Sequence, residues 1–252
     1  MDTRSNAFSD ADGVYMQKPE WILFDCMETI VDVVIKPEIR TYLFWGYEGC
    51  GYESLWDDFD SFMEDYVQIR DNLKESQEQY REFNSLDIYR LMAVGKLTDK
   101  QQAETAANRI LQTYWVNYTK NCYVDDTVHC TLKELSSQYQ CGVVSNFMMD
   151  GGIEELLKTF DIYRYFDFVV TSVRTGWKKP HSRIYNDAMT NIKVSKDKVL
   201  FVGDNFNCDY TGPRQYGFNS VLLDKENRYP QVPERINAIG ELPDWLNRAA
   251  FT

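Results

Sequence analysis

Five short apolar runs, each ending at a polar turn, stand out along the chain. They cover residues 21–24, 141–146, 166–172, 198–204 and 219–224. A continuous apolar run of this length, bounded by turn residues, is typical of a strand that is buried on both faces. We therefore predict five strands in the interior of a sheet.

In the second half of the chain, these runs alternate with stretches in which apolar residues recur at helical spacing. The predicted helices cover residues 131–139, 152–160, 182–192 and 210–218. Buried strands that alternate with helices are typical of a parallel sheet with helices on both faces. The pattern predicts an α/β fold, with a Rossmann-like three-layer parallel sheet core.

Residues 33–122 have a different pattern, with helical spacing and no clear strand. The spacing recurs in residues 85–94 and 106–115. It is clearest within residues 59–73, where the apolar side chains are Phe59, Phe62, Met63, Tyr66 and Ile69. This block therefore predicts an all-helical insertion after the first strand.

These patterns divide the chain into three parts. Residues 1–18 are polar and aperiodic, so we expect a loose tail. The Rossmann-like core comprises residues 19–32 and 123–252, and residues 33–122 form the inserted helical domain. A chain of 252 residues is long enough for such a core with an insertion.

Charge narrows the range of partners. The chain has 39 acidic and 27 basic side chains, a formal charge of -12, which argues against binding nucleic acid or an anionic membrane. No apolar stretch approaches ~20 residues, and no secretion signal is recognisable, so we expect a soluble, cytoplasmic protein. The six cysteines include no CxxC pair, which favours reduced, structural thiols.

Reactive side chains gather where the predicted strands end. Carboxyl ends of parallel strands share one edge of a sheet, and ligands of open α/β sheets bind there. Lys179 lies on a connection after the third predicted strand, and the other residues of the group follow strands directly or within a few positions. This group consists of Asp25, Ser145, Asn146, Lys179, Asp204 and Asp209.

Four motifs in chain order carry a family resemblance. They are an apolar run ending in Asp25 with Thr29 four residues later, an apolar strand ending in Ser145, Lys179 before a proline, and Gly203-Asp204 with Asp209 five residues further on. From about residue 20 to 246, the chain resembles the haloacid dehalogenase superfamily of hydrolases. The resemblance is to the branch with a helical cap inserted between the first and second motifs.

This resemblance implies a magnesium-dependent phosphohydrolase that acts on a small phosphorylated metabolite through an aspartyl-phosphate. Asp25 is then the nucleophile, and Ser145, Asn146 and Lys179 bind the phosphoryl oxygens. The implied ligands of Mg²⁺ are Asp25, the backbone carbonyl of Met27, Asp204 and Asp209, and Asp209 could instead orient Lys179. Carboxylate and carbonyl oxygens suit this cation.

Met27 departs from the family pattern, in which phosphatases carry a second acid. That acid protonates the leaving group, and methionine cannot. We expect Glu28 to point elsewhere. The alternatives are a 2-haloacid dehalogenase-like or phosphonate-cleaving hydrolase and a catalytically silent binding protein. The residue 45–56 segment, rich in glycine and aromatic residues, could close over a substrate or simply pack.

Overall fold

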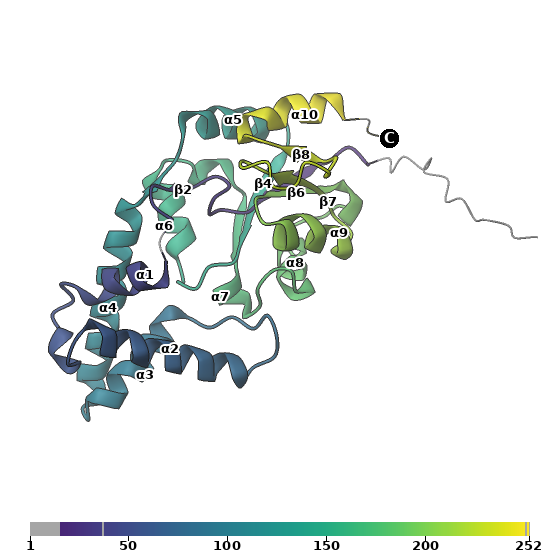
Figure 1. Ribbon diagram of the computed structural model, residues 1–252. Helices are drawn as coiled ribbons and strands as arrows, with labels where there is room; N and C mark the ends of the chain where they lie inside the picture. Colours follow the sequence, from purple (N-terminus) through teal and green to yellow (C-terminus); the bar gives the residue numbers. More distant parts are fainter. Residues whose placement is uncertain (1–15, 37, 250, 252) are drawn as a thin grey trace, which may run out of the picture.

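The computed structural model describes residues 16–36, 38–249 and 251 of the chain (Figure 1). Most of the predicted tail, residues 1–15, lies outside the described residues. Within the described part, the chain forms an α/β body and a group of helices beside it. No described helix combines the length and apolar character needed to cross a bilayer.

The body is built on a six-stranded parallel sheet with the strand order β5-β4-β1-β6-β7-β8. All five predicted strands are present, and the parallel Rossmann-like prediction is confirmed. The sixth strand, β8, spans only two residues and has no pattern that the sequence could reveal. The strands are β1 (Trp21–Phe24), β4 (Gln140–Ser145), β5 (Phe168–Thr171), β6 (Val199–Gly203), β7 (Asn219–Leu223) and β8 (Arg235–Ile236).

The central strand β1 supplies a core on each face of the sheet. Because successive side chains of a strand point to opposite faces, Ile22 and Phe24 pack in one cluster while Trp21 and Leu23 pack in the other. Helices α5, α6 and α10 cover the first face, and α8 covers the second (Figure 1). The helices of the body are α5 (Asp126–Ser136), α6 (Gly152–Thr159), α7 (Ser172–Thr175), α8 (Ser182–Met189), α9 (Gly212–Tyr216) and α10 (Leu242–Arg248).

In the sequence, four helices come after β1 and before the other strands of the six-stranded sheet. They have a hydrophobic core of their own. Phe62 of the predicted amphipathic stretch is fully buried there, together with Ile88 and Ile110 from two other helices. We call these four the inserted helices. They are α1 (Ile39–Tyr47), α2 (Phe59–Glu75), α3 (Ser85–Lys96) and α4 (Lys100–Lys120).

The chain enters and leaves the inserted helices through one short ribbon. Strand β2 (Asp32–Val33) pairs antiparallel with β3 (Cys122–Tyr123). Asn121 extends this pairing, because its side chain accepts a hydrogen bond from the Ile35 amide at 3.1 Å and donates one to the Ile35 carbonyl at 2.8 Å. The two crossings between the body and the inserted helices are therefore held side by side.

The glycine-rich and aromatic segment 45–56 packs within the inserted helices. Cys50 and Trp56 are buried in their core, with exposures of 1% and 5%. The Trp56 indole also donates a hydrogen bond to Asp65 at 2.8 Å. Of the two interpretations left open by the sequence, the structure favours packing, because these anchors hold the segment in place.

Candidate active site

Three neighbouring strands bring the predicted site residues to one edge of the sheet. Strand β1 lies between β4 and β6, and all three run in the same direction. Asp25 follows β1, Ser145 ends β4, and Asp204 follows β6. The Asp25 amide donates to the Val202 carbonyl at 2.9 Å, so the backbone at Asp25 is fixed by the sheet itself.

Lys179 is the centre of this group. Its Nζ lies 2.6 Å from Asp25 Oδ1 and 2.7 Å from Asp209 Oδ1, and the lysine is only 3% exposed. Burial lowers the pKa of Lys179, but the charges of Asp209 and Asp25 and their hydrogen bonds together raise it by more, so the net shift is upward. The lysine is therefore a buried ammonium held by two carboxylates.

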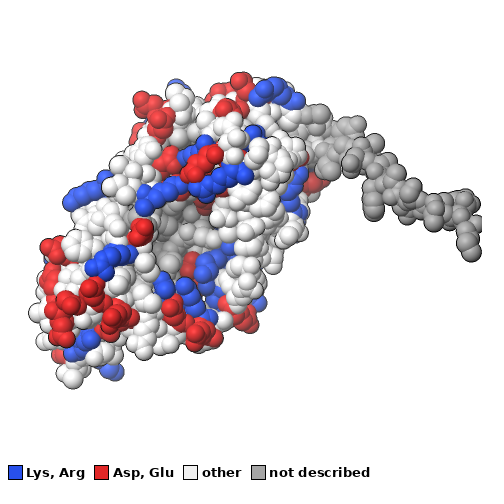
Figure 2. Space-filling view, in the orientation of Figure 1, with Lys and Arg blue, Asp and Glu red and all other residues white. Residues whose placement is uncertain are grey.

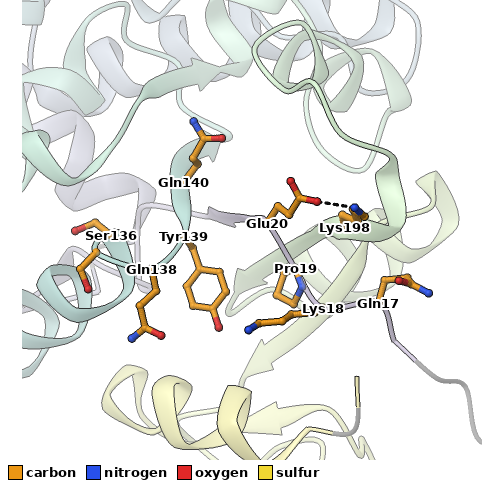
Figure 3. A pocket seen from close by; sticks show the side chains of 10 residues that line it. Gln17, Lys18, Pro19, Glu20, Ser136, Gln138, Tyr139, Gln140 and Lys198 are labelled. Atoms are coloured by element: carbon orange, nitrogen blue, oxygen red, sulfur yellow. Dashed lines mark hydrogen bonds and ion pairs between the residues drawn. The ribbon is translucent and has the colours of Figure 1, made fainter. Parts of the chain in front are cut away.

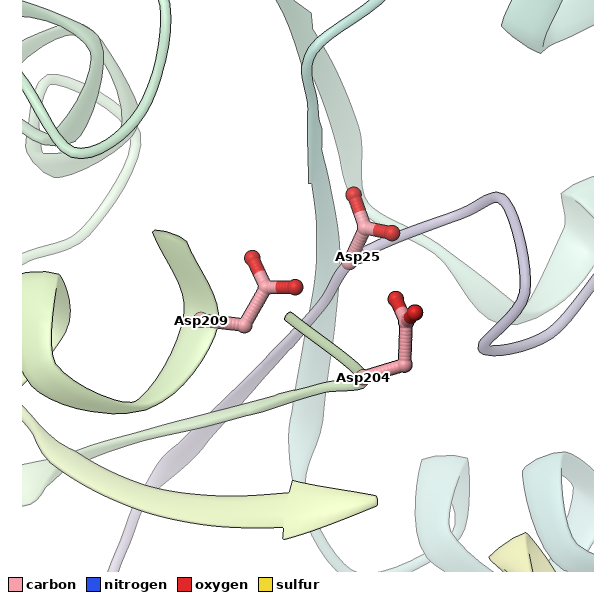
Figure 4. Close-up of side chains that lie close together, drawn as sticks. All are labelled: Asp25, Asp204 and Asp209. Carbon is pink, nitrogen blue, oxygen red and sulfur yellow. The ribbon is translucent and has the colours of Figure 1, made fainter. Parts of the chain in front are cut away.

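The three aspartates converge from separate segments (Figure 4). One oxygen of each of Asp25, Asp204 and Asp209 lies within 4.8 Å of the others. Burial, opposed by the Lys179 ammonium, raises the pKa of Asp209 to about 7. Burial together with the charge of Asp25 raises the pKa of Asp204 to about 6. Three carboxylates around one ammonium leave an excess of negative charge that a cation relieves.

The donor set fits a hard divalent cation. Carboxylate oxygens are the ligands that Mg²⁺ prefers in proteins. Both oxygens of Asp209 are engaged, one by Lys179 and one by the Asn205 amide at 3.0 Å. No described residue forms an ion pair with the half-buried Asp204, so Asp25 and Asp204 keep the oxygens best able to bind a metal.

Asp209 reaches the sheet edge because of a glycine. It lies on the π-helical turn Phe206–Thr211, which follows β6. A Cβ atom placed on Gly203 would lie 2.6 Å from the Cβ, Cγ and Oδ2 atoms of Asp209. Only a residue without a side chain lets the carboxylate pack against the end of the strand.

Asn146 holds the backbone of Lys179. The Lys179 amide donates to Asn146 Oδ1 at 2.7 Å, and Asn146 Nδ2 donates to the Lys179 carbonyl at 3.1 Å. Ser145 is 1% exposed and is paired in the sheet with Thr171. The structure thus brings Asp25, Asn146 and Lys179 together through direct hydrogen bonds, and strand β4 carries Ser145 to the same edge of the sheet.

The loop after Asp25 directs adjacent side chains to opposite sides. The Cys26 carbonyl accepts hydrogen bonds from the Ile30 and Val31 amides at 2.9 Å each, and this tight turn gives Glu28 a φ of 60°. Met27 lines a cavity beside the inserted helices. Glu28 instead pairs with Lys36 at 2.7 Å, in a separate pocket, as expected from the sequence.

The cavity beside Met27 has a volume of about 620 Å³ and lies between the inserted helices and the body. In Figure 2 the surface is hollowed between these two parts, and Lys and Arg side chains gather around the hollow. Arg70, Lys74 and Lys178 are the basic residues of the cavity wall. The aromatic residues of the wall are Tyr42, Tyr66, Phe83, Tyr89, Tyr114, Tyr118 and Phe147.

A second cavity, of about 810 Å³, has no connection with this group (Figure 3). It is lined by residues before β1 and at the start of β4, including Pro19 and Gln140, and by the ion pair of Glu20 with Lys198 at 2.6 Å. These residues lie at the amino ends of the strands. Ligand sites in open α/β sheets lie at the other edge.

Sequence reasoning missed Glu82. This residue is 8% exposed, lies in the connection between α2 and α3, and lines the same cavity as Met27. Burial raises its pKa, although a hydrogen bond from Ser172 opposes the rise. Its partner is 90 residues away in the sequence, so no local pattern could identify it.

Comparisons with known proteins agree with these observations. Residues 57–223 match the family described as haloacid dehalogenase-like hydrolase. The chain is 34% identical over 130 residues to haloacid dehalogenase-like hydrolase domain-containing protein 3 of Homo sapiens, covering 50% of this chain and 51% of that protein. It is also 34% identical over 97 residues to glyceraldehyde 3-phosphate phosphatase of Methanothermobacter thermautotrophicus, covering 38% of this chain and 42% of that protein.

A solved structure has the same fold. The 2-haloacid dehalogenase of Pseudomonas syringae pv. Tomato DC3000 superposes with a TM-score of 0.74 at 18% identity, covering 91% of this chain and 99% of that one. At this identity the likeness concerns the fold alone. The matched segment spans about half the length of the first of these curated relatives and less of the second.

We predict that Gly203→Ala lowers the free energy of unfolding by about 1–3 kcal/mol, because the new methyl group overlaps Asp209. Gly95→Ala in α3 is the control. A Cβ there meets nothing within 4 Å, so helix propensity should stabilise that variant by about 0.5–1 kcal/mol. Chemical denaturation measures both changes, and a Gly203→Ala variant as stable as the wild type would contradict the close packing of Asp209.

Proposed function

The chain belongs to the haloacid dehalogenase-like hydrolase family, and from this premise we propose that it is a magnesium-dependent phosphohydrolase acting on a small phosphorylated metabolite. The observation that carries the proposal is the buried Lys179 ammonium between Asp25 and Asp209, with Asp204 beside them. Such a cluster suits a reaction that must gather negative charge around a nucleophilic carboxylate.

In the proposed reaction, an oxygen of Asp25 attacks the phosphorus atom and the bond from phosphorus to the leaving oxygen breaks. The resulting aspartyl-phosphate is then hydrolysed by water, which restores the Asp25 carboxylate. One difficult displacement thereby becomes two easier ones. The hydrogen bond from Lys179 to Asp25 Oδ1 orients the carboxylate for this attack.

The phosphoryl oxygens are bound in this proposal by Lys179, Ser145 and Asn146. The Lys179 ammonium neutralises charge on the phosphoryl oxygens, and Asp209 holds the ammonium in place. Asp25, the Met27 carbonyl and Asp204 would hold Mg²⁺, and Asp209 would contribute mainly through Lys179. When bound, Mg²⁺ supplies positive charge that offsets repulsion between the nucleophile and an anionic substrate.

Met27 sets the kind of leaving group. In this proposal the leaving group lies in the cavity that the Met27 side chain lines, and a thioether donates no proton. A leaving alkoxide therefore departs without help from this position, whereas the oxyanion of an acyl or enol phosphate needs little protonation. We propose that the substrate belongs to the second group.

The inserted helices act as a cap in this proposal. A cavity of about 620 Å³ is in the range that accommodates a metabolite-sized ligand. Its aromatic wall suits the carbon skeleton of the leaving group, and its basic residues suit a further acidic substituent. The cavity thus offers the leaving group a binding surface that differs in character from the charged site around Lys179.

One observation favours a second candidate, hydrolysis of a carbon–halogen bond. The apolar Met27 faces a largely aromatic cavity, and an apolar environment suits attack by Asp25 on carbon. This reaction needs no metal. Asp204 forms no ion pair with any described residue and lies where it suits a metal, so it weighs against the metal-free second candidate and against a silent binding protein.

Asp25→Asn should reduce phosphatase turnover to less than about a tenth of the wild-type rate, because the nucleophilic charge is lost while the shape is kept. Turnover is measured with p-nitrophenyl phosphate and magnesium, and circular dichroism checks the fold. Asp161→Asn, an exposed change of the same chemistry, is the control and should keep full activity. Higher residual activity in Asp25→Asn would rule out this nucleophile.

Asp204→Ala should weaken the binding of Mg²⁺ at least tenfold, roughly the loss of one good ligand. Isothermal titration calorimetry with the metal alone measures this directly. Asp187→Ala, which removes an exposed carboxylate on α8, should leave the affinity unchanged. If the wild type and both variants bound Mg²⁺ with equal affinity, the main argument against the dehalogenase candidate would be removed.

Met27→Asp should raise activity toward an alkyl phosphate more than toward p-nitrophenyl phosphate, since only the alkoxide needs a proton donor. General acid catalysis contributes ~10²–10⁴ in rate. The gain should be smaller, because the surrounding side chains do not orient a new carboxylate. Met27→Leu is the control without a proton donor, and an equal gain on both substrates would contradict this role of position 27.

A further inference from the structure

We propose that Glu82 is a positioning residue, whose carboxylate clamps the inserted helices onto the loops that carry Asn146 and Lys179. The clamp fixes the backbone from which the Lys179 ammonium extends. The meaning of this placement for catalysis rests on the function proposed above. The clamp itself is a property of the fold and can be tested without turnover.

The Glu82 carboxylate joins two parts of the chain that are distant in sequence. Ser172 Oγ, at the start of α7, donates to Glu82 Oε2 at 2.7 Å across a separation of 90 residues. The Phe83 amide donates to Glu82 Oε1 at 3.3 Å. Both oxygens therefore accept hydrogen bonds, one from the body and one from the connection itself.

Ser172 passes this contact on to the loop after β4. The Phe147 amide donates to Ser172 Oγ at 2.8 Å, so the serine accepts one hydrogen bond while it donates another to Glu82. The neighbouring Asn146 makes two hydrogen bonds to the main chain of Lys179. A continuous series of hydrogen bonds and one peptide link thus leads from Glu82 to Lys179.

The main chain of the same connection pairs with the segment before Lys179. The Glu82 amide donates to the Gly176 carbonyl at 3.0 Å, and the Lys178 amide donates to the Tyr80 carbonyl at 2.8 Å. Arg81 and Trp177 form the antiparallel bridge between these two bonds. Residues 80–82 therefore run alongside the segment that immediately precedes the lysine.

A buried carboxylate in this place is not required for packing. Burying an ionisable group costs free energy, and apolar residues of similar size often replace such groups without loss of stability. A leucine could not accept the hydrogen bond from the Ser172 hydroxyl and so could not fix the relative position of the two parts. The geometry therefore points to a role in alignment of the site.

Three variants test this role. Glu82→Ala removes the acceptor, Glu82→Gln keeps an oxygen that can accept from Ser172, and Ser172→Ala removes the donor. We expect Glu82→Ala and Ser172→Ala each to lower kcat about tenfold with magnesium, and the double variant to lose no more than either single variant. Glu82→Gln should retain most of the activity, because the hydrogen bond is kept.

The choice of substrates separates positioning from recognition. Acetyl phosphate has a small leaving group, and p-nitrophenyl phosphate has a large one that would extend into the cavity in the proposed binding mode. A misplaced Lys179 affects both, so kcat should fall similarly for the two compounds while KM changes little. A loss confined to KM for the larger ester would mean that Glu82 binds the substrate and would overturn the proposal.

Hydrogen exchange gives the readout that needs no activity. In Glu82→Ala, amides in residues 145–148 and 176–179 should exchange at least about tenfold faster, while those of β1 should not change. Glu78→Ala, an exposed change in the same connection, is the control. Unchanged exchange in both loops overturns the proposal. If the wild type hydrolyses neither compound, the proposed function fails, and this measurement alone still decides the role of Glu82.

Discussion

The burial of one ammonium group between two carboxylates is the constraint on which the rest of the site depends. A charge taken out of water costs several kcal/mol unless its partners are well placed. Lys179 has such partners at 2.6 and 2.7 Å, from the end of β1 and from the π-helical turn after β6. Neighbouring features hold all three groups in place. The sheet fixes the backbone of Asp25, and Gly203, which has no side chain, leaves room for Asp209. Asn146 holds the backbone of Lys179 through two hydrogen bonds.

The turn after Asp25 divides the surroundings of the site into two chemical environments. Met27 faces an aromatic cavity, whereas Glu28, with its left-handed backbone, pairs with Lys36 on the other side. The only carboxylate in this turn beyond Asp25 is therefore directed away from the cavity. The charged group around Lys179 and the aromatic cavity are therefore separated by one short turn.

Much of the fold and the site could be predicted from the sequence, because both depend on strand ends. Asp25, Ser145 and Asp204 each follow an apolar run, and a parallel sheet brings such ends together. Lys179 was placed at the same edge because it lies on the connection after the third predicted strand, and the family resemblance supplied its role. Glu82 could not be found, because its role arises from a contact across 90 residues. The two-residue strand β8 is likewise too short to leave a pattern.

The ribbon of β2 and β3 has a consequence for how the molecule folds. The ribbon pairs residues 32–33 with residues 122–123. The insertion between them is therefore equivalent to the long loop of a β-hairpin. Closing a long loop costs entropy that grows only slowly with its length. The inserted helices also have their own core, so they can collapse first and bring the ends of the ribbon together. The effective loop between the central strand and its sequence-distant neighbours β4 and β6 is then shorter than their separation in the sequence.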